Sequence, residues 1–175
     1  MPAPLIRLYI AVSVDGYIAP PDGSSAWLAD YDANQYGYAD FIAGIATVVM
    51  GRASYEEALA LGDWPWPGRR CVVLTSRRIA PPPGAEIEVR SGDAAEIAVE
   101  LKQAGGGDVW LLGGAKTARP FLREGLVDRL ELFVIPVLLG DGIRLFEPGL
   151  PRRQLRLEKA QSHPRGVVEL IYARG

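Results

Sequence analysis

Three short segments of the chain combine glycine, hydroxyl or arginine residues where a phosphate could bind. Each follows an apolar run, and they are Gly51-Arg52, Thr75-Ser76-Arg77 and Gly113-Gly114. A turn between a strand and a helix offers backbone amides and the positive helix end to a phosphate, and arginine adds a charged fork. The three segments together therefore predict a nucleotide-binding site.

Each segment also has a purely structural explanation. Glycine turns let strands pack closely against helices, and hydroxyls or arginines occur in many solvated loops. None of the three contains the Gly-x-Gly-x-x-Gly pattern of a Rossmann domain or the Gly-Lys-Ser/Thr pattern of a phosphate loop. The nucleotide prediction therefore depends on the order and spacing of the segments, because no single motif carries it.

The residue counts argue against several other kinds of chemistry. Cys71 and His163 are each the only residue of their type in the 175-residue chain. An internal disulfide, a His-rich zinc site and a Cys-His or Ser-His-acid triad are thus not expected, and we predict no metal. We interpret His163 as a loop residue beside Pro164. Hydride transfer needs none of these groups, because a cofactor supplies the reactive atom and the protein supplies placement.

Composition predicts one soluble, cytoplasmic domain over residues 1–175. The formal net charge is −2 and the sequence pI is about 5.5, so neither nucleic acid nor a membrane surface is expected as a partner. The longest apolar stretch, 132–139, is far shorter than the roughly 20 residues that cross a bilayer. The N-terminus lacks a signal-peptide pattern, and a lone cysteine fits the reducing cytosol.

The elements that must position the three segments follow from alternating apolar and helical patterns. Strands are expected at 5–12, 47–50, 71–74, 87–89 and 109–112, and helices at about 31–43, 52–61, 93–104 and 116–124. This alternation is typical of a largely parallel sheet with helices on both faces. Further strands are expected at 129–139, 155–160 and 167–173, and the connection 162–166 predicts a C-terminal antiparallel hairpin.

Over nearly its whole length the chain resembles the dihydrofolate reductase superfamily. The matching segments are 11–19, Met50-Gly51-Arg52-x-Ser54-Tyr55-Glu56, 75–77 and 112–114. They are similar to the family's first strand and nicotinamide loop, its Gly-Arg-x-Thr/Ser motif, its 2′-phosphate loop and its Gly-Gly turn, which in that family contains a cis peptide bond. The run 126–142, followed by Leu145-Phe146, resembles a narrower branch, the reductase domain of bifunctional riboflavin-biosynthesis enzymes and their stand-alone relatives. The zinc deaminase half of those enzymes is missing.

The resemblance implies an α/β fold of the dihydrofolate reductase type. It has three layers, a mixed but mostly parallel central sheet with helices on both faces, and a C-terminal antiparallel hairpin. The implied cofactor is NADPH. The residues that the resemblance assigns to it are Ala11 and Ile18 at the nicotinamide, Gly113, Gly114 and Lys116 at the pyrophosphate, Arg52, Thr75, Ser76 and Arg77 at the 2′-phosphate, and Gly51, Ser54, Leu112 and Thr117 in the adjoining turns.

Asp32 is the candidate catalytic residue. In dihydrofolate reductases an acidic residue of the first helix grips the substrate ring and assists its protonation, and Asp32 follows Trp27 at the family's offset. Burial in an apolar cleft would raise the pKa of such a carboxyl toward that of a general acid. Trp27 and Tyr36 are expected to face the same substrate. Asp30 is a rival position, and an aspartate at a helix start is equally typical of a cap.

We therefore expect an NADPH-dependent reductase of a small heterocyclic substrate. The substrate could be the ribosylaminopyrimidine phosphate of riboflavin synthesis, as for 5-amino-6-(5-phosphoribosylamino)uracil reductase, a pterin or a related compound. The sequence shows no clear cluster of basic residues for binding a substrate phosphate. The scattered candidates for that contact are Lys116, Arg123 and Arg144. The resemblance also implies a homodimer. Dihydrofolate reductase proper, and a sensor of this fold that binds NADPH without turnover, stay open as alternatives.

Overall fold

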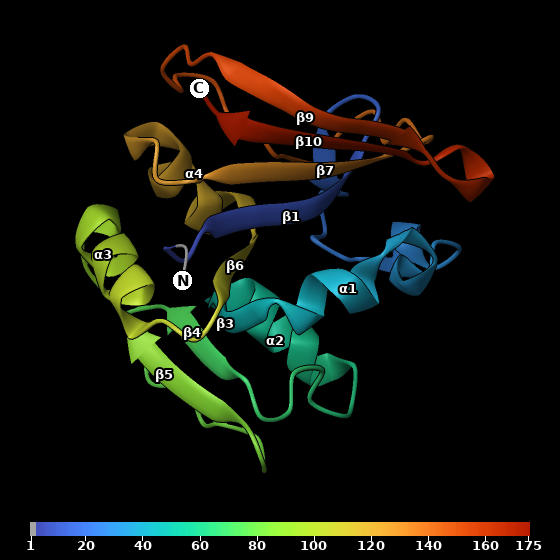
Figure 1. Cartoon of the computed structure of the whole chain (residues 1–175). Coiled ribbons are helices and arrows are strands. Elements are labelled where there is room, and N and C mark those ends of the chain that lie inside the picture. Colours follow the sequence, from blue (N-terminus) through green and yellow to red (C-terminus); the bar gives the residue numbers. More distant parts are fainter. Residues whose placement is uncertain (1–2) are drawn as a thin grey trace.

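A single eight-stranded sheet forms the centre of the computed structural model, which describes residues 3–175. The strand order is β5-β4-β3-β6-β1-β7-β10-β9. Figure 1 shows β5 at one edge of the sheet and the β9–β10 hairpin at the other. The strands are β1 (Ile6–Ser13), β3 (Ile45–Gly51), β4 (Arg70–Leu74), β5 (Glu86–Arg90), β6 (Asp108–Gly113), β7 (Arg129–Ile135), β9 (Leu155–Ser162) and β10 (Val168–Arg174).

Strand directions confirm the mixed, mostly parallel sheet. All neighbours from β5 to β7 in the sheet order pair in parallel, whereas β10 runs antiparallel to both β7 and β9. The predicted C-terminal hairpin is therefore present. Because β3, β4 and β6 are parallel, their carboxyl ends lie at the same end of the sheet, which is where α/β sheets usually bind ligands.

Helices cover both faces of this sheet, so the three-layer prediction is also confirmed. Side chains of α1 (Tyr38–Ala43) and α2 (Arg52–Ala60) pack with Val48 and its neighbours, whereas those of α3 (Ala94–Ala104) and α4 (Ala115–Glu124) pack with Val49 and its neighbours. Consecutive strand residues point to opposite faces, which explains how adjacent valines serve different layers. Figure 1 shows the two helix pairs on opposite sides of the sheet.

The predicted helix over 31–43 is wrong. The chain forms two short 3₁₀ helices, η1 (Ala26–Leu28) and η2 (Ala33–Tyr36), followed by the six-residue α1. Gly37 separates η2 from α1 with a φ of 83°, a left-handed conformation that a continuous helix cannot contain. The short, broken segment covers the β1–β7–β10 part of the sheet only partly.

The predicted strand over 129–139 ends early. β7 stops at Ile135, and Pro136, which lacks an N–H, cannot extend the ladder. The loop that follows contains β8 (Ile143–Arg144), which pairs antiparallel with β2 (Tyr17–Ala19). This small second sheet was not expected from the sequence. No helix among residues 3–175 is long and apolar enough to cross a membrane.

Candidate functional site

A cleft of about 320 Å³ lies at the carboxyl ends of β4, β5 and β6. It brings one of the predicted segments, the loop after β4, together with the first turn of α4, which directly follows the predicted Gly113-Gly114 turn. The residues lining it are Leu74, Thr75, Ser76, Arg90, Ser91, Gly92, Ala94, Ile97, Lys116, Thr117, Pro120 and Phe121. Hydroxyls and cations thus surround an apolar floor, an arrangement suited to a nucleotide with a phosphate.

Local hydrogen bonds shape the polar side of this cleft. The Thr75 amide donates to the Arg90 carbonyl at 2.9 Å, which joins the loops that follow β4 and β5. The Arg77 amide donates to Thr75 Oγ1 at 3.1 Å and so closes the loop on itself. Arg90 was missed from the sequence, although its position directly before the Ser91-Gly92 turn was the available signal.

A crowded glycine cradle adjoins the cleft. A Cβ atom on Gly51 would overlap Thr117 Oγ1, so only glycine fits between β3 and α4. Gly113 has a φ of +107°, and the Gly113–Gly114 peptide bond is cis, as the resemblance implied. A Cβ on Gly114 would lie 4.0 Å from both Ile18 Cδ1 and Ser54 Oγ. Predicted cofactor residues from three parts of the chain, at 18, 51–54 and 113–117, therefore meet here.

Other predicted cofactor residues take different positions. Arg52 bonds Glu56 across one turn of α2 at 2.6 Å, and Arg77 has an exposed side chain; neither lines the cleft. Leu112 is half-buried in the core between the sheet and α2. Ala11 is half-buried on β1 and packs against a cluster that contains Tyr36 and Phe133.

Asp32 lies at the surface and caps η2. Its Oδ1 accepts hydrogen bonds from the Asn34 amide and from Asn34 Nδ2, each at 3.0 Å. The closed apolar cleft expected around this carboxyl is absent, because the side chain is exposed. The geometry is that of the cap alternative.

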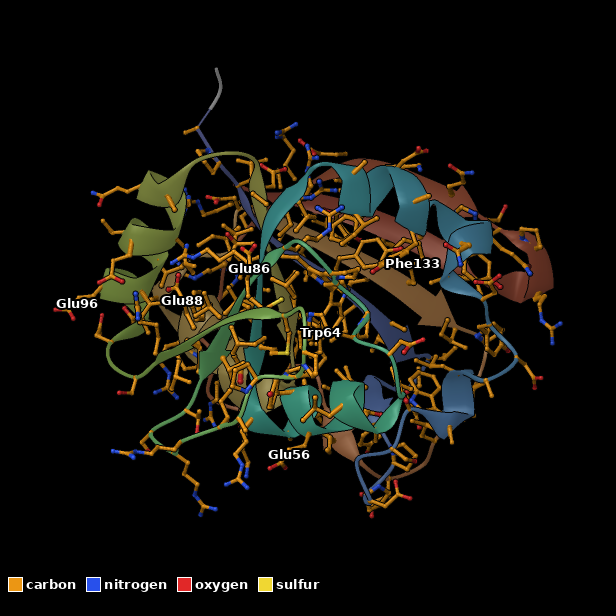
Figure 2. The ribbon with its side chains drawn as sticks, turned by 90° about the horizontal axis from the view of Figure 1, so that it is seen from below. Glu56, Trp64, Glu86, Glu88, Glu96 and Phe133 are labelled. Atoms are coloured by element: carbon orange, nitrogen blue, oxygen red, sulfur yellow. The ribbon has the colours of Figure 1, made fainter. Side chains whose placement is uncertain are left out.

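Tyr36 and Trp27 turn inward. Tyr36 is 5% exposed and lines a second hollow, on the sheet face, together with Tyr9, Phe133 and His163. Trp27 packs against the same apolar cluster, and its indole nitrogen is buried with no hydrogen-bond partner within residues 3–175. In Figure 2 Phe133 lies between the sheet and the η2–α1 segment.

His163 is not the simple loop residue that the sequence suggested. Its Nε2 lies 2.8 Å from Glu169 Oε2, and its ring meets the Tyr36 ring edge-on, with centroids 5.6 Å apart. Glu169 is 6% exposed and Glu131 is 3% exposed, and neither was singled out from the sequence. The signal that could have found them is an acid within an otherwise apolar strand, as in Val167-Val168-Glu169-Leu170.

The loop after β1 is tied to the loop after β7. Asp15 accepts hydrogen bonds from Ser13 Oγ at 2.6 Å, the Gly140 amide at 2.7 Å and the Leu139 amide at 3.1 Å. These bonds, led by that of Ser13, lower the pKa of the Asp15 carboxyl. Arg144 donates to Tyr17 Oη at 3.0 Å and stacks on its ring, so it is already engaged within this second sheet.

Cys71 is buried within the sheet, and burial raises the pKa of its thiol to about 12. Residues 3–175 contain no group of three or more His, Cys, Asp or Glu side chains that could hold a metal ion.

Comparison with known families matches residues 4–168 to the RibD C-terminal domain model. The chain belongs to this family. YwjB of Bacillus subtilis, an uncharacterised protein, is 36% identical over 169 residues, covering 95% of this chain and 96% of its own length. The riboflavin biosynthesis protein RibD of Corynebacterium ammoniagenes is 32% identical over 161 residues, which are 80% of this chain but 45% of that protein. The predicted family is therefore confirmed, and the chain spans less than half the length of the RibD protein that it matches.

Solved structures agree on the fold. The RibD-family chain aligns with a structure of a putative riboflavin biosynthesis protein from Shewanella sp. PV-4 with a TM-score of 0.86 and 26% identity, covering 98% of this chain and 99% of that one. Dihydrofolate reductase from Enterococcus faecalis aligns with a TM-score of 0.69 and 16% identity, covering 98% and 96% of the two chains. The predicted dihydrofolate-reductase-like fold is confirmed.

Proposed function

We propose that this RibD-family chain is an NADPH-dependent reductase of a small heterocyclic substrate. The observation that carries the proposal is the continuous arrangement of the 320 Å³ cleft and the glycine cradle at the carboxyl ends of β3, β4 and β6. A dinucleotide needs such a site, because its pyrophosphate must approach backbone closely while its adenosine phosphate needs hydroxyls and cations.

The adenosine end belongs in the cleft. Thr75 and Ser76 supply hydroxyl donors for a 2′-phosphate, and Arg90 and Lys116 bring positive charge to the same walls. Arg77, exposed in the same loop, and Arg52, at the start of α2, remain predicted contacts of the 2′-phosphate. This assignment adds Arg90 to the predicted Arg52 and Arg77 because of its position, since Arg90 lines the cleft and the other two do not. Arg90 is also paired with acids, with Glu88 at 3.0 Å and Glu100 at 3.7 Å, as Arg52 is with Glu56, so a phosphate would compete with these carboxylates for it.

The pyrophosphate and nicotinamide follow along the cradle. The glycines 51, 113 and 114 admit the pyrophosphate, beside Thr117 and the start of α4, where amides point outward. The nicotinamide then lies against Ala11 and Ile18, under the loop that Asp15 fastens. Bound NADPH supplies a hydride; the side chains of the chain orient the acceptor C=N or C=O, exclude water and leave the completing proton to a neighbouring group or solvent. Asp32 stays a prediction for that group.

A homodimer is part of the proposal. All eight residues of the edge strand β9 are exposed, including Leu155 and Leu157, which leaves a full strand edge available to a second copy. Light scattering after gel filtration measures this directly: a mass near twice the 19.0 kDa of one chain is expected, and a monomer at high micromolar concentration would contradict it.

The test of the function has two stages. Titration with NADPH should quench the fluorescence of the tryptophans, and NADH should bind more weakly, because it lacks the 2′-phosphate. NADPH oxidation is then followed with pteridine and aminopyrimidine substrates, with and without a phosphoribosyl group. Binding without oxidation of NADPH by any of them would favour the sensor, and absence of binding would contradict the proposal altogether.

A further inference from the structure

A hollow of about 390 Å³ lies on the face of the sheet between the η2–α1 segment and strands β9 and β10. It exists because the first helix of the chain is broken at Gly37 and leaves this part of the sheet partly uncovered. Tyr9 and Phe133 form an aromatic floor, their ring centroids 4.6 Å apart. Tyr36 and His163 form one wall.

Every cation in the hollow faces a buried carboxylate. Glu169 Oε2 lies 2.8 Å from Lys159 Nζ and 2.8 Å from His163 Nε2. Glu131 accepts two hydrogen bonds from Arg7, at 2.6 Å and 2.9 Å. The hollow therefore has no uncompensated positive charge to offer a phosphate, and an incoming phosphate would lie beside two nearly buried acids.

One buried polar atom in the hollow, the Tyr36 hydroxyl oxygen, lacks a hydrogen-bond partner among residues 3–175. Tyr36 is 95% buried, since 5% of its surface is exposed, and its hydroxyl has no hydrogen bond within residues 3–175. Nearby, Glu169 contacts both Lys159 and His163 through Oε2. A buried hydroxyl without a partner is costly, so its persistence in a hollow indicates that something else supplies the bond.

The hollow adjoins the proposed nicotinamide position. Ala11 of β1 is the direct register partner of Phe133 in β7, so both side chains lie on the same face of the sheet, next to each other. Ala11 and Trp27 also pack against the cluster that contains Tyr36 and Phe133. A ring that lies on Phe133 would therefore reach the residue assigned to the nicotinamide.

We propose that this hollow binds the polar end of the substrate, and that the ligand there is a planar, uncharged heterocycle with N–H groups and no phosphate. The inference rests on the proposed reductase function. Glu169 Oε1 accepts an amino or ring N–H, Tyr36 Oη bonds a ring nitrogen or carbonyl, and the ring stacks on Tyr9 and Phe133. Glu169, on β10, is then the carboxylate that determines specificity, in place of Asp32.

Pterin and ribose 5-phosphate are the probes for this site. Calorimetric titration of pterin into protein saturated with NADP⁺ fills the cofactor cleft first and avoids turnover. Pterin should bind, and ribose 5-phosphate added beforehand should leave its affinity unchanged. Competition by ribose 5-phosphate, or no binding of pterin with or without NADP⁺, would overturn the inference.

Two conservative variants connect the binding to the residues. Glu169→Gln should weaken pterin by roughly one to two orders of magnitude, because a charge-assisted bond becomes neutral. Tyr36→Phe should weaken it by roughly threefold to tenfold while leaving the unfolding midpoint unchanged or higher, because it removes only the unpartnered hydroxyl. Tyr172→Phe, on the other face of β10, and Glu158→Gln, in an ion pair on β9, are matched controls that should leave pterin binding unchanged.

The outcomes separate this inference from the function on which it rests. If both Glu169→Gln and Tyr36→Phe bind pterin with unchanged affinity and bind NADPH normally, the hollow is not the substrate site, while the reductase proposal stands. If Glu169→Gln loses pterin binding but the wild-type protein binds no NADPH, the hollow is a ligand site and the reductase proposal is wrong. A melting curve of each variant shows that it is folded before it is titrated.

Discussion

The cofactor end and the substrate end of the proposed site consist of different kinds of residues. The cofactor cleft and cradle use glycines, small hydroxyls and backbone amides from turns at strand ends, whereas the hollow on the sheet face uses charged and aromatic side chains from the middle of β1, β7 and β10. The first is assembled from short continuous segments and the second from residues more than one hundred positions apart, such as Arg7 and Glu131. The cofactor cleft and cradle can therefore be predicted from short segments of sequence, whereas the hollow depends on the register of the sheet.

Breaking the ion pair beneath the hollow should have the largest effect on stability. Glu131→Gln leaves the Arg7 guanidinium, whose side chain is 14% exposed, with only the more distant Asp108 at 3.3 Å. We expect a loss of about 3 kcal/mol in the free energy of unfolding, from urea denaturation. Glu88→Gln removes two more exposed pairs, with Arg70 at 2.9 Å and with Arg90 at 3.0 Å, and should cost about 1 kcal/mol or less. Equal losses would mean that the hollow's charges are no different from surface charges.

Filling the cradle should have the largest effect on the cofactor. In Gly51→Ala the new Cβ overlaps Thr117 Oγ1, so the Thr117 side chain must rotate or α4 must shift, at about 1–3 kcal/mol of stability, and NADPH affinity should fall at least about tenfold. Gly44→Ala places its Cβ at an ordinary 3.7 Å from the Phe41 carbonyl oxygen and is the control. NADPH titration of both proteins measures the difference, and equal affinities would remove the cradle from the cofactor site.

Substitutions of Asp32 test whether this residue belongs to the substrate end of the site or only caps η2. If Asp32 is a cap, Asp32→Asn preserves stability and turnover, because asparagine caps equally well, whereas Asp32→Ala loses about 0.5–1 kcal/mol of unfolding free energy. If Asp32 is the catalytic acid, Asp32→Asn loses most of the NADPH oxidation rate and keeps its stability. The cap geometry predicts the first result.

Removing the carboxylate of Asp15, which holds the loops after β1 and β7 together, should have the smallest effect on stability, and this effect should depend on pH. Hydrogen bonds depress the folded pKa of Asp15, so its contribution to stability is present above the unfolded pKa, near 4, and is lost as pH falls through the folded value. The stability difference between wild type and Asp15→Asn should thus be constant above about pH 5 and shrink below about pH 4.

Much of the fold could be predicted because its signals are local. Short apolar runs between helical segments predicted the strands β1, β3, β4 and β6, and the Gly-Gly turn together with the Gly51 turn predicted the cradle. The β2–β8 pair could not be predicted, since two-residue strands such as β8 carry no period. The helix over 31–43 failed because one glycine at 37 outweighed helical spacing, and Tyr36 consequently faces a hollow instead of a helix groove.

The site residues that escaped prediction share one physical reason. Three of them can be recognised as site residues only from the partners that strand pairing places beside them, namely Glu131, Glu169 and His163. Arg90 can be recognised only from the cleft that it lines. In isolation an acid in a strand resembles a solvated edge position. Once register is known, its burial and its partner show that it belongs to a built site.

The central claim, that the carboxyl-edge cleft reads the 2′-phosphate of NADPH, is tested most directly by the ratio of NADH to NADPH dissociation constants. Calorimetry should give a ratio of at least about ten for wild type, falling toward one in Arg90→Ala, since a charge-assisted phosphate contact is lost. Arg123→Ala, near the end of α4 and outside the cleft, should keep the wild-type ratio. Equal affinities for NADH and NADPH in wild type, or an unchanged ratio in Arg90→Ala, would contradict the account.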